Sequence, residues 1–443
     1  MNLNARLIPE SSPGGGASEA TSLVLDAERL RCLCREAGAD DVGLVSVDAI
    51  ALDREREEIL RFFPATRTLV SFVCRMNREP LRSPDRSVAN LESHQTFDRL
   101  NEVGHKIVAA MERDGVRAIS TSPAFPMDMG RASGRGWPVS HKPVAVAAGL
   151  GIMGLHRLLI HPLFGDYILL GTVLLAAESS EYNRPLGDNP CLDCKLCVAA
   201  CPTGAIAADG HFNFSACFTH NYRDYFGGFT NWVEQVADSK NASEYRRKVS
   251  DAETASVWQS LAHGGTYKCV HCLAVCPAGK DVSSSFLADK SAYMDTVVRP
   301  LQEKSETVYV VPGSDAEVHV RRRFPSKRLK RVGNGLHANS ISQFLGALPL
   351  VFQREVSTGL DATYHFTFRG EEDCRATVII RDKTVQVSQG HIGTSDLRVT
   401  ADSRWWIGFL AKDRNLFWGL LRLKLRLKGA PKLLSDFAKC FPS

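Results

Sequence analysis

Apolar residues recur at helical spacing near the start of the chain, at Leu25, Leu30, Leu33 and Cys34, and stop before Gly38. This pattern predicts a helix that ends at the glycine. Two apolar stretches, residues 42–47 and 68–73, predict strands on either side of a charged helix over residues 53–63. Helices and strands therefore alternate, which predicts an α/β domain.

The alternation continues to about residue 185. Residues 91–114 have one apolar and one polar side and predict a second helix. Residues 158–162 and 167–175 predict buried strands around a turn at Phe164-Gly165-Asp166. We therefore expect a flexible, Ser- and Gly-containing arm over residues 1–23 and a first domain over residues 24–185.

The last part of the chain shows a second, separate pattern. A helix is predicted from about residue 340, strands over 363–368, 377–380 and 384–388, and a closing helix after Pro431. These elements predict a compact α+β domain over residues 336–443. The preceding residues 291–335 predict a basic linker, because residues 321–331 contain seven basic side chains and no acidic one. An anionic partner, whether lipid, RNA or an acidic protein, is the alternative reading of this basic run.

Composition narrows the class of protein. The 443 residues are 44% hydrophobic and 23% charged, in the range of globular proteins, and the net charge of +5 does not by itself indicate nucleic acid or membrane. No apolar run reaches the roughly 18 residues that span a bilayer, and the N-terminus lacks the pattern of a signal peptide. We therefore expect a cytoplasmic protein without a transmembrane segment, and we leave peripheral membrane contact open.

Cysteine placement is the strongest chemical signal. Eight of the thirteen cysteines fall between Cys191 and Cys276. Cys191-x2-Cys194-x2-Cys197-x3-Cys201-Pro202 has the spacing of the bacterial ferredoxin run, in which three thiolates surround one face of an iron-sulfur cluster and the fourth binds a second cluster. The spacing therefore predicts a partner motif elsewhere.

The partner motif is Cys269-x2-Cys272-x3-Cys276-Pro277, which has one cysteine fewer than a complete run. The isolated Cys217 supplies the missing ligand, so that eight thiolates are available for two 4Fe-4S clusters. We assign the first cluster to Cys191, Cys194, Cys197 and Cys276, and the second to Cys201, Cys217, Cys269 and Cys272. Structural zinc is the alternative, but its four-ligand tetrahedron has no use for the third closely spaced cysteine. The other five cysteines are expected in the core.

The segment before the cysteines resembles a known superfamily. Gly149-Leu150-Gly151-Ile152-Met153-Gly154, then an apolar strand, Pro162-Leu163-Phe164-Gly165 and the ferredoxin run follow the order of the epoxyqueuosine reductases and reductive dehalogenases. The resemblance covers residues 24–290. It implies a nitroreductase-like first domain, a ferredoxin-like block over residues 186–290, and a bound cobalamin close to Gly149, Gly151 and Gly154.

The chain departs from this pattern where the family carries its proton donor. Epoxyqueuosine reductases have an acidic residue three positions before the proline of the Pro-Val segment, and this chain has Arg135 before Pro138. An arginine is not a conventional acid, although it can stabilise developing negative charge. Arg135 and His141 are therefore the candidate catalytic residues, and for Arg135 a structural salt bridge is the alternative. The departure argues against epoxyqueuosine as the substrate.

The C-terminal domain resembles the SCP-2 sterol-carrier domains, on the segments around residues 360–370, 376–380, 396–400 and 421–437. The aromatic stretch around Trp405, Trp406 and Phe409 could line a lipid cavity or form an ordinary core. The tRNA-binding helical repeat that epoxyqueuosine reductases usually carry at this end is not visible in this chain.

Together these features predict an iron-sulfur oxidoreductase that passes electrons through two 4Fe-4S clusters to cobalamin and reduces a hydrophobic, lipid- or isoprenoid-like substrate. One alternative is an electron-transfer or lipid-binding protein without corrinoid, and another is a tRNA-modifying reductase. The expected partners are an electron donor such as ferredoxin or flavodoxin and a hydrophobic small molecule. We do not expect nucleic acid as a partner.

Overall fold

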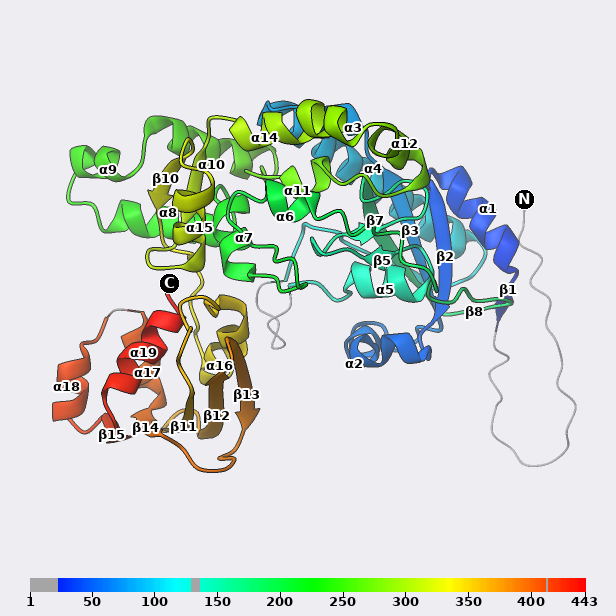
Figure 1. Cartoon of the computed structure of the whole chain (residues 1–443). Coiled ribbons are helices and arrows are strands. Elements are labelled where there is room, and N and C mark those ends of the chain that lie inside the picture. The colour runs from blue at the N-terminus through cyan, green and yellow to red at the C-terminus, as the bar shows by residue number, and fades with distance from the viewer. Residues whose placement is uncertain (1–22, 129–135, 412) are drawn as a thin grey trace, which may run out of the picture. The chain divides into compact units, whose positions relative to one another are not determined.

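The computed structural model of the chain describes residues 23–128, 136–411 and 413–443. These residues form two compact units (Figure 1). The first contains the residues up to Cys197 together with His271–Arg299, and the second contains Val198–Val270 and Pro300–Ser443. Residues 186–290, expected as one ferredoxin-like block, are therefore shared between both units. The sequence spacing indicated the ligands but not how the intervening chain packs.

An antiparallel four-stranded sheet lies at the centre of the first unit, in the order β2-β3-β7-β4. Its strands are β2 (Asp41–Ser46), β3 (Thr68–Arg75), β4 (Ala118–Thr121) and β7 (Ile168–Leu175). The strand β3 pairs with β7 along its whole length, from Thr68 opposite Leu175 to Arg75 opposite Ile168 (Figure 1). Seven of its eight residues are buried, which explains its continuous apolar sequence.

Helices cover both faces of this sheet and so form three layers. On one face, α1 (Ala27–Ala37) and α4 (Arg86–Arg113) place Leu30 and Ile107 in a core with Phe72. On the other face, α2 (Asp53–Phe62) and α5 (His141–Ala147) pack with Leu69 of β3. The helix α1 ends at Gly38, whose φ of 114° is accessible to glycine at little cost, as the sequence predicted.

Shorter elements complete the first unit. They are β1 (Val24–Leu25), which pairs with β8 (Glu178–Ser179), the hairpin of β5 (Ile152–Met153) and β6 (Leu159–Ile160), the 3-10 turn Ile50–Leu52, α3 (Arg78–Arg82), α6 (Leu196–Ala200), α11 (His271–Ala274), α12 (Lys280–Ala288), α13 (Lys290–Tyr293) and the π-helical turn Met294–Val298. The helix α6 continues across the boundary into the second unit.

The second unit begins with helices α7 (Phe214–Asn221), α8 (Gly227–Ala237), α9 (Ala242–Lys248) and α10 (Asp251–His263), followed later by α14 (Arg299–Glu303). Three of them, α8 to α10, lie between the two cysteine motifs in the sequence. Asn241 and Ser250 cap α9 and α10 and so separate these helices.

The basic linker expected over residues 291–335 is wrong, because most of it is folded. The strands β9 (Thr307–Val310) and β10 (Arg328–Arg331) form a parallel pair around α15 (Asp315–Arg323). Lys327 is buried, with its Nζ 2.8 Å from a carboxylate oxygen of Glu306, and Glu317 accepts hydrogen bonds from Arg331 and Arg321. The acidic partners lie outside the basic run, so the run looked solvated in the sequence.

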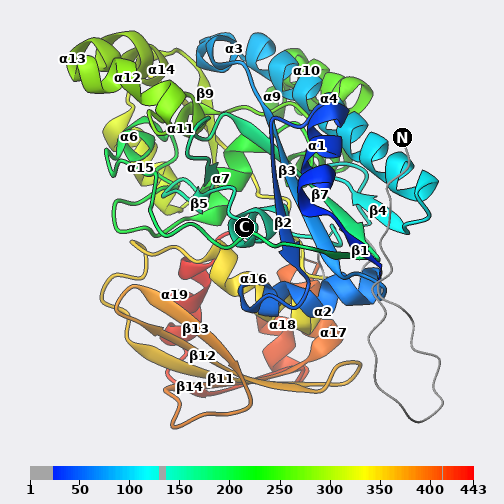
Figure 2. The ribbon, with the colours of Figure 1, turned by 90° about the vertical axis from the view of Figure 1, so that its right-hand side faces the viewer.

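The C-terminal part of the second unit is a five-stranded sheet in the order β13-β12-β11-β14-β15 (Figure 2). The pair β11–β14 is parallel and the other pairs are antiparallel. Its strands are β11 (Ala362–Arg369), β12 (Cys374–Arg381), β13 (Thr384–Gln389), β14 (Leu397–Asp402) and β15 (Leu425–Gly429), and its helices are α16 (Ile341–Val351), α17 (Ser403–Leu410), α18 (Leu416–Leu421) and α19 (Lys432–Cys440).

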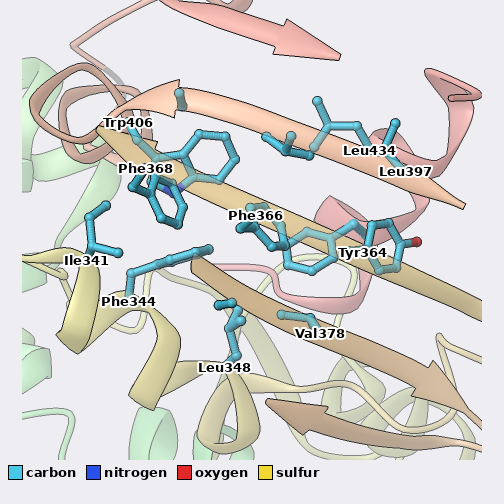
Figure 3. Close-up of a cluster of buried hydrophobic side chains, with 14 of the residues drawn as sticks. Ile341, Phe344, Leu348, Tyr364, Phe366, Phe368, Val378, Leu397, Trp406 and Leu434 are labelled. Atoms are coloured by element: carbon cyan, nitrogen blue, oxygen red, sulfur yellow. The ribbon is translucent and has the colours of Figure 1, made fainter. Parts of the chain in front are cut away.

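The core of this sheet is built from aromatic side chains (Figure 3). Phe366 and its neighbours on β11 face Phe344 of α16, Trp406 of α17 and Phe437 of α19, and the rings of Phe344 and Trp406 lie 5.6 Å apart. Trp405 is also buried in this core. Of the two alternatives for the aromatic stretch, a lipid cavity or an ordinary core, the packing of Trp405 and Trp406 favours the core. The resemblance to the sterol-carrier domains stays a prediction.

The mixed α/β class is confirmed, whereas the nitroreductase-like and ferredoxin-like identities of its parts stay predictions. Within the described ranges, none of the helices combines the length and apolar composition needed to cross a bilayer. Of the five cysteines expected in the core, Cys34, Cys74 and Cys440 are buried, but Cys374 is partly exposed and Cys32 is exposed. Cys32 lies on the outer face of α1, because it precedes the buried Cys34 by two positions.

Candidate iron-sulfur site

Cys191 and Cys194 lie on a tightly coiled loop before α6, and Cys197 is the second residue of that helix. Asp193 and Lys195, which flank Cys194, have φ values of 47° and 58°. Non-glycine residues adopt this left-handed conformation at an energetic cost and do so mostly at functional sites. At Asp193 and Lys195 this conformation turns the chain sharply, so that Cys191, Cys194 and Cys197 line the same hollow.

Cys276 reaches that hollow from the other sequence segment of the first unit. The hollow holds about 310 Å³ of space outside protein atoms, part of it open to solvent. It is lined by Leu155, His156, Ile160, Cys191, Leu192, Cys194, Lys195, Cys197, Cys276, Pro277 and Ala278. The four cysteines that we assigned to the first cluster therefore converge within one unit, surrounded mainly by apolar side chains.

Without a bound metal, the surroundings of Cys276 and Cys194 favour neutral thiols. Burial raises the pKa of the Cys276 thiol well above its ordinary value, and the nearby Asp166 raises it further. Burial also raises the pKa of Cys194. A bound metal reverses this preference, because a coordinating thiol loses its proton. Four convergent sulfur ligands at ferredoxin spacing thus fit a 4Fe-4S cluster.

The second predicted ligand set is divided between the units. Cys201, Cys217 and Cys269 belong to the second unit, and Cys272 belongs to the first. Within the second unit, Cys217 lies on α7, and Asn221 of the same helix accepts a hydrogen bond from the backbone N–H of Cys269 over 3.0 Å. The assignment of these four cysteines to one cluster stays a prediction.

The three glycines that we assigned to a cofactor loop contact the chain itself. A Cβ on Gly149 would lie 2.5 Å from the carbonyl oxygen of Arg184, and one on Gly151 would lie 2.5 Å from that of Ile160. A Cβ on Gly154 would meet the ring of His156 at 2.6 Å. Glycine is therefore required here by internal packing. Their assignment to a corrinoid site stays a prediction, because internal packing alone already accounts for the glycines.

Of the two candidate catalytic residues, the structure describes only His141. His141 is the first residue of α5, and both ring nitrogens are engaged: Nδ1 lies 2.9 Å from the hydroxyl oxygen of Thr172 and Nε2 lies 3.0 Å from the carbonyl oxygen of Ser122. Burial lowers the pKa of the imidazole, which favours its neutral form. Arg135 lies outside the described residues.

The structure adds two residues that sequence reasoning missed. His156 and Asp166 are buried beside Cys276, and one ligand atom from each of the three lies within 4.8 Å of the others. Neither residue belongs to a motif that we could read. In the chain they are separated by β6 and by the turn that the bridge between His161 and Gly165 closes.

Several curated proteins are similar to parts of this chain. Curated relatives include proteins from Lactococcus garvieae, 29% identical over 143 residues, and Staphylococcus aureus, 37% identical over 81 residues. A protein from Aliivibrio fischeri is 24% identical over 192 residues. The chain resembles epoxyqueuosine reductases. All three relatives carry that name, and the predicted resemblance is thereby confirmed.

The similarity to epoxyqueuosine reductases is partial. The alignments cover 32%, 18% and 43% of this chain and 33%, 21% and 41% of those relatives. The chain thus spans less than half the length of the curated relatives it matches. No family model matches the chain.

Solved structures of epoxyqueuosine reductases and of a reductive dehalogenase are similar to this chain only at low sequence identity. An epoxyqueuosine reductase with an epoxyqueuosine-modified tRNA-Tyr stem loop is 16% identical, with a TM-score of 0.35, and the match covers 73% of this chain and 86% of the other. A catabolic reductive dehalogenase is 18% identical, with a TM-score of 0.35 over 53% of this chain and 36% of the other. TM-scores of this size do not establish a shared fold.

One expectation needs correction. We did not expect nucleic acid as a partner, and that expectation is wrong, because an epoxyqueuosine reductase is solved with a tRNA stem loop. Our reasoning relied on the absence of a C-terminal helical repeat and on a mild net charge. Phosphate contacts need only a local group of basic side chains, which the net charge of a whole chain does not reveal.

Proposed function

We propose that this chain is an iron-sulfur reductase that acts on a modified nucleoside in tRNA. The observation that carries the proposal is the convergence of Cys191, Cys194, Cys197 and Cys276 on one hollow. The names of the curated relatives support the substrate class and favour epoxyqueuosine as the nucleoside to test, although Arg135 stands where those reductases carry an acidic residue.

The residues around the hollow have separable tasks. The four cysteines would hold a 4Fe-4S cluster, which supplies one-electron transfer. Leu155, Ile160 and Ala278 line the hollow and reduce the access of water to the sulfur atoms, and solvent exposure is one factor that sets the potential of such clusters. The positive φ at Asp193 and Lys195 fixes the ligand loop before metal arrives, so less ordering is needed on binding. An electron donor such as ferredoxin or flavodoxin belongs to the same proposal.

Only the resemblance to epoxyqueuosine reductases and reductive dehalogenases suggests a bound cobalamin. The three glycines contact the chain's own atoms, so no catalytic step is assigned to the corrinoid. The hydrophobic substrate has no support either, since Trp405 and Trp406 are part of a packed core. Measuring cobalt beside iron and sulfide on anaerobically purified protein tests whether corrinoid is present.

The test uses the full chain and tRNA that contains epoxyqueuosine. The reconstituted protein is incubated anaerobically with a reductant, and the nucleosides are identified by mass spectrometry. We expect loss of epoxyqueuosine with the parent protein and at least a hundredfold slower conversion with Cys194→Ser. Cys32→Ser, an exposed cysteine on α1 far from the ligand loop in sequence, should retain parent activity and iron.

The outcomes separate the parts of the proposal. Protein without iron and acid-labile sulfide would refute the iron-sulfur reductase itself. Protein with clusters that neither binds nor converts the tRNA would refute the substrate class and would favour an electron-transfer protein.

A further inference from the structure

The short helix α18 and the turn that follows it expose large apolar side chains. Trp418 is 53% exposed, Leu421 is 62% exposed and Leu423 is 66% exposed, and Leu420 between them is 38% exposed. Single apolar residues are common on a protein surface, whereas a group of them along one short segment marks an interaction site. Residues 418–423, the α18 tip, are therefore a candidate interaction site.

Packing within the second unit fixes the direction of these side chains. Gly419 is the buried residue of α18, and a Cβ there would lie 2.0 Å from Cζ2 of the buried Trp405. The backbone of α18 thus lies directly on the indole ring. The neighbouring Trp418 and Leu420 consequently point away from the core.

The turn after α18 carries a backbone cost as well. The N–H groups of Leu423 and Lys424 donate to the carbonyl oxygens of Leu420 and Gly419 over 3.2 and 2.9 Å, which ends the helix. Leu423 has a φ of 56°, in the left-handed region that glycine adopts at little cost and leucine does not. An exposed leucine in this conformation costs stability twice, and such costs are concentrated at functional sites.

Basic side chains follow the α18 tip along the edge strand β15, which lies next to α18 (Figure 1). Residues 414–435 contain six basic residues and no acidic one. Lys424 Nζ lies 3.0 Å from a carboxylate oxygen of Asp402. Arg426 and Lys428 have no ion-pair partner within the described part of the chain, so this edge has an excess of positive charge.

The alternation of β15 places its cations on one exposed face. Leu425 and Leu427 pack on the core, so Arg426 and Lys428 point to the opposite side of the sheet. Arg398 of β14 lies directly opposite Lys428 in the strand register and is exposed too. Like charges opposite each other destabilise a sheet, and an anionic partner would remove that repulsion.

An anionic lipid surface fits both kinds of side chain at once. The phosphates of RNA would pair with the cations but would leave the leucines of the α18 tip in water. Anionic headgroups attract basic side chains, and the boundary below them takes up leucine and tryptophan. Trp418 has the guanidinium carbon of Arg422 over its ring, 5.7 Å from the centroid, and both residue types combine an apolar body with a polar end.

We propose that the α18 tip and the basic face of β15 bind this protein to a membrane surface that contains anionic phospholipids. The apolar side chains of the tip enter the headgroup region, and Arg426 and Lys428 pair with the lipid phosphates. This binding goes beyond the proposed function and requires neither the cluster nor tRNA.

The experiment is cosedimentation of the anaerobically purified full chain with lipid vesicles. One set of vesicles is pure phosphatidylcholine, and the other contains about 30% phosphatidylserine, which gives it a negative surface. We expect binding to the second set only. Binding should weaken in about 0.5 M salt, because salt screens the attraction between the cations and the headgroups.

Apolar and charged variants separate the two contributions. Leu421→Ser should weaken binding at least about tenfold, because the leucine no longer leaves water. Its control is Ile392→Ser, which removes an apolar side chain of similar exposure, 54%, after β13 and should bind like the parent.

The double variant Arg426→Gln with Lys428→Gln should weaken binding about 25-fold, since each cation at such a surface contributes about fivefold. Its control is Arg322→Gln with Arg323→Gln, which removes two exposed charges from the end of α15 and should bind like the parent.

Several results would overturn the inference. Parent protein that ignores both sets of vesicles refutes it, whether the segment then proves to bind tRNA through Arg426 and Lys428 or a second copy of the chain through Leu421. Equal binding by a variant and its control refutes the role of that segment. If Leu421→Ser lowers the unfolding midpoint, Trp418→Ala takes its place in the assay and should also bind more weakly. Each of these results leaves the iron-sulfur reductase proposal intact, because vesicle binding is measured without substrate.

Discussion

The hydroxyl group of Tyr167 donates a hydrogen bond to the carbonyl oxygen of Ala274 over 2.7 Å, and both groups are buried. Tyr167 immediately precedes β7, and Ala274 ends α11 two residues before Cys276. The contact therefore anchors the segment that delivers the fourth cluster ligand to the central sheet of the first unit.

Replacing Tyr167 with phenylalanine should loosen this anchor. The change leaves the Ala274 carbonyl without its partner, which costs about 1–3 kcal/mol. We expect a chelator to remove iron from Tyr167→Phe faster than from the parent. Tyr364→Phe is the control, because Tyr364 donates to the carbonyl oxygen of Leu433 in the second unit. Equal rates of iron loss in Tyr167→Phe and the parent would contradict the anchoring role.

Gly149→Ala tests whether the glycine loop is required by packing. Gly149 has a φ of 70°, and the added methyl would lie 2.5 Å from the Arg184 carbonyl oxygen. Strain and overpacking together should destabilise the protein by about 2 kcal/mol or more, seen as a lower denaturation midpoint. Gly187→Ala adds a methyl where nothing lies within 4 Å and should have little effect. Similar midpoints in both variants would argue against the packing role.

Glu317 should make the folded state sensitive to acid. Hydrogen bonds from Arg331 lower its pKa from 4.5 to about 2 despite partial desolvation. A depressed pKa contributes stability above the unfolded value and loses it as the pH falls from about 4.5 towards 2. In urea titrations followed by circular dichroism, the parent should exceed Glu317→Gln in stability at pH 7, and the difference should shrink at pH 3. A difference that is constant with pH would contradict this assignment.

Phe366→Ala tests the aromatic core of the C-terminal sheet. Phe366 is fully buried among Phe344, Trp406 and Phe437. Its truncation should cost about 3–5 kcal/mol, because it removes buried surface and leaves a cavity. Trp418 is 53% exposed on α18, so Trp418→Ala should change the unfolding midpoint little. If Phe366→Ala unfolds like the parent, this region is a cavity rather than a packed core.

Elements with strong apolar periodicity could be predicted from the sequence. The helix before Gly38, the strands at residues 41–46 and 68–75, and the strands β11 to β13 of the C-terminal sheet lie where the apolar spacing of the sequence predicts them. Cys191, Cys194 and Cys197 belong to the same class, because the ferredoxin spacing is a short-range signal. Cys276 was assigned from the rule that the last cysteine of such a run binds the other cluster.

Partnerships between distant residues could not be predicted. Lys327 looked like one charge of a solvated run, yet its ammonium group is enclosed by the carboxylate of Glu306 and two backbone carbonyl groups. The pair of His156 and Asp166 forms where the chain turns back between them, at the bridge of His161 with Gly165. Such contacts depend on which segments the chain brings together, and single-residue patterns do not encode that.

The hollow of the first cluster is completed by sulfur atoms from both sides of a long excursion, since residues 198–270 belong to the other unit. During translation, Cys191, Cys194 and Cys197 leave the ribosome well before Cys276 does. A complete set of four sulfur ligands therefore exists only after residue 276 has been synthesised, and we expect cluster insertion to follow synthesis of the intervening helices.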